Sequence, residues 1–117
     1  MSEVNTYNIV IHQGATWYFN MTVYDENDTA ENLTGYSAVM QVRDKPGGKL
    51  LAEFSTANTL IAALDTTGKI AITVPAATTK TYTWRNGVYD IYIKHSSGDP
   101  VVYLLKGDFR VDARTSQ

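Results

Sequence analysis

The two histidines, His12 and His95, are the residues best suited to acid–base or metal chemistry, and each stands alone beside a turn. A zinc site needs several convergent ligands, and the chain has no cysteine and no His-x-His or Glu-x-x-His spacing. Nucleophilic catalysis needs a serine or thiol next to an oriented base, and no Gly-x-Ser-x-Gly sequence is present. The residues therefore predict no catalytic residue, no metal site and no enzyme activity.

Three loop sequences resemble ligand-binding motifs without completing them. The run Asp25–Asp28 is faintly like a calcium loop, but Ala30 and Tyr36 occupy the positions where such a loop needs Gly and Glu. The pairs Gly48-Lys49 and Gly68-Lys69 are followed by apolar residues, where a phosphate-binding loop needs Ser or Thr. These sequences are typical of solvated turns, and we expect no cofactor.

Composition limits the classes of partner. The 117 residues are 44% hydrophobic and 19% charged with a net charge of −2, which is ordinary for one folded domain, 1–117, with an ordered core over about 7–112. The cations are scattered, whereas nucleic-acid binding needs them clustered. No apolar run approaches the roughly 20 residues that span a bilayer, and the N-terminus lacks a secretory apolar segment. We expect neither a nucleic-acid nor a membrane partner, and synthesis in the cytoplasm.

The elements that must position any site are strands, because apolar residues alternate with polar ones. Trp17, Phe19, Met21 and Val23 fall on one side of such a run, a period of two that excludes a helix. Turn residues separate the runs, and residues 76–84 after Pro75 read as a crossover with one helical turn. The pattern predicts strands near 7–12, 16–24, 37–43, 50–55, 59–63, 69–74, 87–94 and 101–111.

Many short strands without a long helix are typical of a sandwich. We predict an all-β, single-domain, antiparallel immunoglobulin-like β-sandwich of about seven to eight strands, with the last two strands paired as a hairpin. The inward-facing side chains of the alternating runs should form the core. They are Ile9, Ile11, Trp17, Phe19, Met21, Val23, Ala38, Met40, Val42, Ile70, Ile72, Val74, Tyr89, Ile91, Ile93, Tyr103, Leu105, Phe109 and Val111.

Four apolar residues fall on the opposite, outward registers: Val39, Tyr92, Val102 and Leu104. Their strands share one sheet in an immunoglobulin-like sandwich, so the four would form an exposed apolar patch. Such patches mark partner sites. The alternatives are coverage by a loop or by the N-terminal segment, and the ordinary scatter of apolar residues over a surface.

Several segments resemble a family of small immunoglobulin-like tail and baseplate proteins of long-tailed bacteriophages. The resemblance runs from about Ile9 to Thr115. It is carried by Asn32–Tyr36 with Ala38–Arg43, by Gly68–Val74 with Gly87–Ile91, and by Val101–Val111. Members of this family serve as collar, decoration or fibre-attachment subunits, and the resemblance carries over no catalytic residue. Tyr89 also fits a tyrosine corner, in which the hydroxyl bonds back to the backbone.

Two functions follow as expectations. The first, implied by the resemblance, is a non-enzymatic structural protein of a phage tail or baseplate, which contacts other tail proteins, forms a homo-oligomeric ring and resides in the virion. The second is a carbohydrate or host-surface binding module, in which Tyr18 and Tyr24 with the Trp84 region would form an aromatic platform. Exposure of these rings together would favour the second function.

Because no ion site is predicted, we expect the domain to fold without metal. Adding a chelator should leave the midpoint of thermal unfolding unchanged, since only a ligand that binds the native state raises it. Calorimetry with and without EDTA tests this, and a large drop in the midpoint would contradict it.

Overall fold

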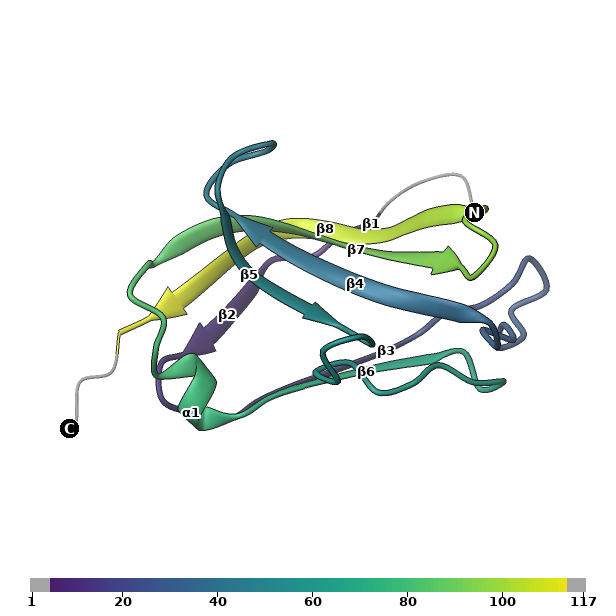
Figure 1. Ribbon diagram of the computed structural model, residues 1–117, viewed down its shortest axis with the longest axis horizontal. Coiled ribbons are helices and arrows are strands. Elements are labelled where there is room, and N and C mark those ends of the chain that lie inside the picture. The colour runs from purple at the N-terminus through teal and green to yellow at the C-terminus, as the bar shows by residue number, and fades with distance from the viewer. Residues whose placement is uncertain (1–4, 114–117) are drawn as a thin grey trace.

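The computed structural model describes residues 5–113, and its strands form two layers that face each other (Figure 1). The strands are β1 (Asn5–Thr6), β2 (Ile9–His12), β3 (Trp17–Thr22), β4 (Tyr36–Arg43), β5 (Leu50–Ser55), β6 (Lys69–Val74), β7 (Asn86–His95) and β8 (Val101–Asp112). One layer is a six-stranded sheet in the order β1-β8-β7-β4-β5, with β2 also paired to β8. The other layer is the pair β3-β6.

This strand order confirms the predicted immunoglobulin-like sandwich. In that fold the second and fifth strands pair in one sheet, while the third, sixth and seventh lie in the other, and β3-β6 and β4-β7-β8 reproduce this arrangement. The predicted final hairpin is also present, because β7 pairs antiparallel with β8. One feature differs: β1 and β2 run parallel to β8 rather than antiparallel.

The predicted crossover contains the short helix α1 (Ala76–Thr79), which confirms the single helical turn after Pro75. It lies at one end of the sandwich, between β6 and β7 (Figure 1). The buried Thr79 hydroxyl donates to the carbonyl of Ala15 at 2.8 Å and accepts from the amide of Gly14 at 3.0 Å. These bonds fix the turn between β2 and β3 against the crossover.

The predicted strand at 59–63 is wrong. The segment makes one isolated bridge, from Ile61 to Ile72 of β6. Asn58 explains the difference, because its side-chain oxygen accepts from the amides of Ser55 and Leu60 at 2.9 and 3.1 Å. Asparagine in such a position favours a turn, so residues 56–60 turn the chain and residues 60–62 lie along β6 without forming a ladder.

Aromatic rings form the centre of the core. Phe109 is fully buried, and its ring centroid lies 5.6 Å from that of Trp17, 5.8 Å from Trp84 and 6.2 Å from Tyr89. Close aromatic pairs of this kind add stability beyond the area they bury. The core therefore joins β8, β7 and the crossover to β3. Trp17 itself is only half-buried, as are Phe19 and Met21 on the same strand.

An extra residue in β8 changes which side chains face inward. Ile91 pairs with Leu105 and the next residue, Tyr92, pairs with Tyr103, so Leu104 has no opposite partner. Such a bulge reverses the alternation on either side of it. Leu104 and Leu105 are both buried, whereas Tyr103 is 47% exposed. Tyr103 is thus not a core residue, contrary to the prediction from the alternating pattern.

The same bulge corrects the predicted patch. Leu104 retains only 2% exposure, and Val102 packs against the core, so neither lies on the outer surface as predicted. Val39 and Tyr92 are on the outward side, half-buried. Further buried residues that the alternating pattern did not identify include Leu33, Phe54, Ile61 and Tyr82.

The N-terminal segment is held at the edge of the six-stranded sheet by Tyr89. Its hydroxyl donates to the backbone carbonyl of Tyr7, whose amide donates to the carbonyl of Lys106 at 2.8 Å. Tyr89 therefore bonds to the segment between β1 and β2, far away in the sequence, rather than to the nearby backbone of a tyrosine corner. A Cβ at Gly107 would lie 2.2 Å from the Tyr7 carbonyl oxygen, so only glycine permits this close approach. Thr115, where the family resemblance ends, lies outside the described residues.

The bulge generates a test on two adjacent residues. Leu104→Ala should cost about 2–5 kcal/mol of unfolding free energy, because it leaves a cavity, and Tyr103→Ala should cost about 1 kcal/mol or less, because this ring faces outward. Urea unfolding of both variants measures the difference. Equal costs, or the reverse order, would contradict the inward direction of Leu104.

Candidate functional site

The exposed side of the β4-β7-β8 sheet, called here the outer face, carries a row of apolar and aromatic residues. Val39 of β4 lies opposite Tyr92 of β7, which lies opposite Tyr103 of β8. The two tyrosine ring centroids are 5.1 Å apart with planes inclined by 41°. Next to them Val101 is 42% exposed at the start of β8. This row retains two residues of the predicted patch, Val39 and Tyr92, and adds Tyr103 and Val101.

A polar row crosses the same strands next to the apolar one. Glu53, Gln41, Asp90 and Lys106 lie opposite one another in that order from β5 to β8. The Gln41 side-chain amide donates to the Glu53 carboxylate at 2.9 Å, and its oxygen accepts from the Arg43 guanidinium at 3.2 Å. Cross-strand neighbours of this kind are the unit of contact within a sheet, so the hydrogen bonds hold these polar groups in place.

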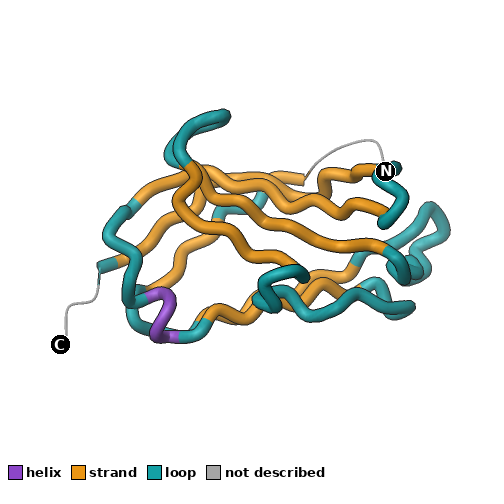
Figure 2. The backbone as a smooth tube through the Cα atoms, in the orientation of Figure 1, coloured by secondary structure: helices purple, strands orange, loops and turns teal. Residues whose placement is uncertain are grey.

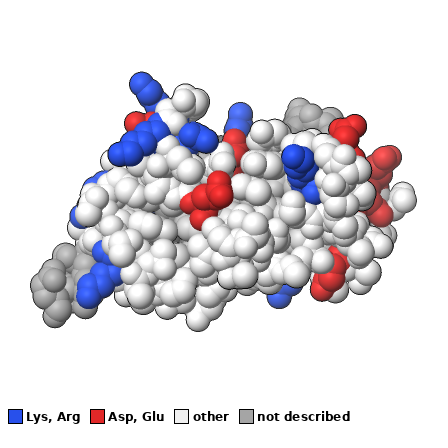
Figure 3. Space-filling view, viewed as in Figure 1, with Lys and Arg blue, Asp and Glu red and all other residues white. Residues whose placement is uncertain are grey.

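The loop between β4 and β5, residues 44–49, forms a wall beside these rows. The Arg43 guanidinium donates to the carbonyl of Gly48 at 2.8 Å, and the Asp44 carboxylate accepts from the amide of Lys49 at 2.8 Å. Figure 2 shows the loop standing away from the strands, and Figure 3 shows basic side chains gathered over it. These bonds fix the direction in which the loop projects.

Between this loop and the outer face lies a concavity of about 600 Å³. It combines two tyrosines, Tyr89 and Tyr103, with charges of both signs. Mixed polar and apolar linings of this kind orient a bound group while excluding water from part of it. The lining includes Gln41, Arg43, Pro46, Asp90, Tyr103 and Lys106.

Partial burial raises the pKa of two ionisable groups on the outer face, Asp90 and Tyr92. The pKa of Asp90 is raised above its ordinary value by burial, and the neighbouring positive charge of Arg43 partly opposes this shift. The pKa of Tyr92 is raised, first by burial and then by the charges of Tyr103 and Glu53. Because desolvation disfavours a charged carboxylate, the charged form of Asp90 is less stable than that of an exposed aspartate. A cationic or hydrogen-bond-donating partner would stabilise it.

Taken as a whole, the outer face has the composition of a protein-binding surface. Such surfaces carry an apolar, often aromatic centre inside a polar rim. Tyr92 and Tyr103 supply the aromatic centre, while Lys94, Lys106 and Asp108 lie on the same side as exposed or partly exposed charges. The geometry is suited to docking another macromolecule.

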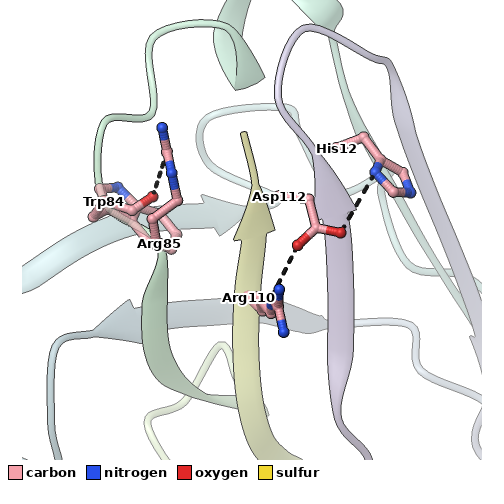
Figure 4. A network of polar contacts seen from close by, with 5 residues as sticks. All are labelled: His12, Trp84, Arg85, Arg110 and Asp112. Atoms are coloured by element: carbon pink, nitrogen blue, oxygen red, sulfur yellow. Dashed lines mark hydrogen bonds and ion pairs between the residues drawn. The ribbon is translucent and has the colours of Figure 1, made fainter. Parts of the chain in front are cut away.

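The two histidines lie away from this face. His12 Nδ1 is 3.9 Å from the carboxylate of Asp112, which also accepts from the Arg110 guanidinium at 2.8 Å, on the exposed β2-β8 edge (Figure 4). His95 is the last residue of β7, where its Nδ1 lies 2.9 Å from the hydroxyl of Ser97, and the Ser97 hydroxyl donates to the carbonyl of Asp99. His95 Nδ1 also accepts from the amide of Ser97 at 3.2 Å, so these contacts arrange the turn.

The acidic loop after β3 bonds to its own backbone. One carboxylate oxygen of Asp25 accepts from the amides of Asn27 and Thr29 at 2.8 and 3.0 Å. Within residues 5–113 no three His, Asp or Glu side chains are grouped so that they could hold a metal ion. Over the same residues, no helix has the length and apolar character needed to cross a membrane.

The aromatic platform of the alternative function is not assembled. Trp84 packs against the core, with its ring 5.8 Å from that of Phe109. Tyr18 and Tyr24 are 69% and 56% exposed, but they are six positions apart, which corresponds to about 20 Å at the rise of an extended chain. The three rings that the sequence suggested for glycan binding therefore do not form one surface.

No protein-family model matches the chain, and no curated protein matches it. Among solved structures, the chain is similar to the crystal structure of CopC from Methylosinus trichosporium OB3b, at 17% sequence identity and a TM-score of 0.48. The match covers 93% of this chain and 89% of that chain. At this identity and TM-score, the likeness assigns neither a family nor a ligand to the protein.

Two buried tyrosines predict how stability depends on pH. Burial raises the pKa of Tyr82 to about 12, and burial together with the charge of Tyr7 raises the pKa of Tyr89 further above its ordinary value. Each phenol therefore holds its proton more tightly in the folded state than in the unfolded chain. The stability gained in this way is complete below a pH of about 10, the pKa of a free tyrosine, and is lost as the pH rises through the folded-state values.

We therefore expect the unfolding midpoint to fall between pH 10 and 12, with a smaller fall in Tyr82→Phe, which keeps the ring and removes the titrating group. Thermal unfolding at a series of pH values, with tyrosinate absorbance recorded in parallel, measures this. Tyr18→Phe, at an exposed ring, is the matched control and should behave as the unaltered protein does. An identical alkaline fall in all three proteins would contradict the assignment.

Proposed function

We propose that the protein is a non-enzymatic structural subunit of a bacteriophage tail or baseplate, acting as a collar, decoration or fibre-docking protein through protein–protein contacts. The observation that carries the docking role is the outer face, where the paired rings of Tyr92 and Tyr103 lie inside a rim of charged residues. The resemblance to small tail and baseplate proteins supplies the biological setting. In that setting the protein is made in the host cytoplasm and resides in the virion.

The physical properties of the outer face support this role. Paired aromatic rings bring a large contact area with few rotatable bonds, which makes them effective anchors in interfaces. The mixed charges around them, such as Asp90 and Lys106, would set the orientation of a bound partner and would contribute less to the affinity. A partner that fits has a small apolar projection to cover the two rings and a polar or cationic group to reach Asp90.

Repetition in a particle allows each contact to be weak. When several copies dock on one symmetric assembly, linked binding events raise the overall affinity far above that of one site. A ring around the tail or baseplate, as the resemblance implies, would supply this repetition. The isolated protein needs no strong affinity for a single partner subunit.

The test is reconstitution with the tail proteins encoded next to this chain. Tyr92→Ala combined with Tyr103→Ala should weaken docking about thirtyfold, because central aromatic anchors contribute about 2 kcal/mol or more. Surface plasmon resonance on purified partners, or the occupancy of the subunit in assembled particles, measures the loss. Both substitutions are at outward rings, so the fold should be retained.

Tyr24→Ala is the matched control, since it removes an exposed ring that lies after the end of β3 and away from the outer face, and it should dock as the unaltered protein does. Failure of the unaltered protein to bind any tail component would overturn the tail role. Normal docking by the double variant, with its fold intact, would show that a different surface carries the contact.

A further inference from the structure

The four edges of the two sheets differ in how they are protected. The edge of β5 is covered by its own continuation, because Ser55 accepts from the amide of Ile61 at 3.1 Å and Asn58 donates to the carbonyl of Glu53 at 3.0 Å. The edge of β6 is bridged by residues 60–62. The third edge is divided into two short strands, β1 and β2. Each arrangement is one that limits pairing with other chains.

The fourth edge, along β3, has none of these protections. Among the described residues β3 pairs with β6 alone, over six residues without a register shift. Its sequence, Trp17–Thr22, contains no charge, no proline and no glycine, and consists mostly of residues that favour strands. Such a strand presents free backbone donors and acceptors to any extended chain that approaches it.

The side chains of β3 also lack full cover. The inward row of Trp17, Phe19 and Met21 is only partly buried, although the paired row on β6, Ile70, Ile72 and Val74, is fully buried. The difference arises because residues 60–62 cover the outer side of β6, whereas no described segment pairs with the outer side of β3. A further strand beside β3 would cover this row and satisfy the edge at the same time.

We propose that a second copy of this chain occupies this position, with β3 pairing antiparallel to β3 about a two-fold axis to give a continuous four-stranded sheet. Charge complementarity argues for this occupant. The loop after β3 carries Asp25, Glu26 and Asp28, whereas the turn before it lies at the end that carries Lys80, because the Gln13 side-chain amide donates to the Lys80 carbonyl at 3.2 Å. Antiparallel pairing places the acidic end of each copy beside the end of the other copy that carries Lys80. Figure 3 shows acidic side chains gathered at the end of the molecule where the loop lies.

The period of two restricts the register. Residues that face each other across an antiparallel pair point to the same side of the sheet. Phe19 must therefore face an inward residue of the second copy, which is Phe19, Trp17 or Met21. With the axis at Phe19, Tyr18 faces Asn20 of the second copy and Trp17 faces Met21. The two half-buried rows then form one continuous apolar surface beneath the four strands.

This register yields a charge-exchange experiment on two outward positions. Tyr18→Lys combined with Asn20→Lys places like charges opposite each other twice and should weaken dimerisation at least about tenfold. Tyr18→Lys combined with Asn20→Glu places opposite charges there and should retain the dimer. Sedimentation velocity of the full chain from micromolar to several hundred micromolar measures both, with circular dichroism as a check that each variant is folded.

The proposal is supported if the unaltered protein dimerises and only the lysine pair weakens it. If the protein stays monomeric over the whole concentration range, the proposal is overturned. The same result would be seen if the strand of a different protein occupied this edge. Equal weakening of both variants, or of neither, would overturn pairing in this register. Tyr103→Ala should leave the dimer unchanged, so this test is independent of the docking role proposed for the outer face.

Discussion

The antiparallel pairing of β7 with β8 sets which side chains of β8 lie on the outer face. Because Leu104 is an extra residue in this ladder, the inward register moves from odd to even positions on its N-terminal side. Leu104 and Leu105 then fill the core together, and Tyr103 is placed outward next to Tyr92. One bulge therefore contributes two residues to the core and one ring to the surface.

The unequal layers are the second constraint on the molecule. Six strands face two, so the core is fully closed over β4, β7 and β8 and thins toward β3. Phe109 and its aromatic neighbours hold the two layers together near α1. The Tyr7 ring covers part of Phe19, with the two ring centroids 5.9 Å apart. Most of the buried core residues lie on the larger sheet, and the inward row of β3 is only partly covered.

The two proposed contact surfaces use different physical chemistry and lie on different sheets. The outer face offers side chains, with aromatic rings in a charged rim, so its recognition depends on shape and charge. The β3 edge offers backbone groups, so main-chain hydrogen bonds would supply its affinity for an extended strand, while the side chains beside them select the partner and the register. A subunit with both surfaces can dock on one partner while pairing with a copy of itself.

The sequence by itself determined the strands and most of the core, because a period of two and Gly, Pro and Asn turns are local properties. It therefore identified the sandwich, the final hairpin and the outward positions of Val39 and Tyr92. Only the tertiary structure decided the bulge at Leu104, the turn that replaces a strand at 59–63, and the parallel pairing of β1 and β2 with β8. The bulge and the parallel pairing depend on which strands become neighbours, and alternation along one strand carries no information about a register that is set by its partner. The turn depends on the hydrogen bonds that the Asn58 side chain makes once the chain is folded, which the alternation does not show.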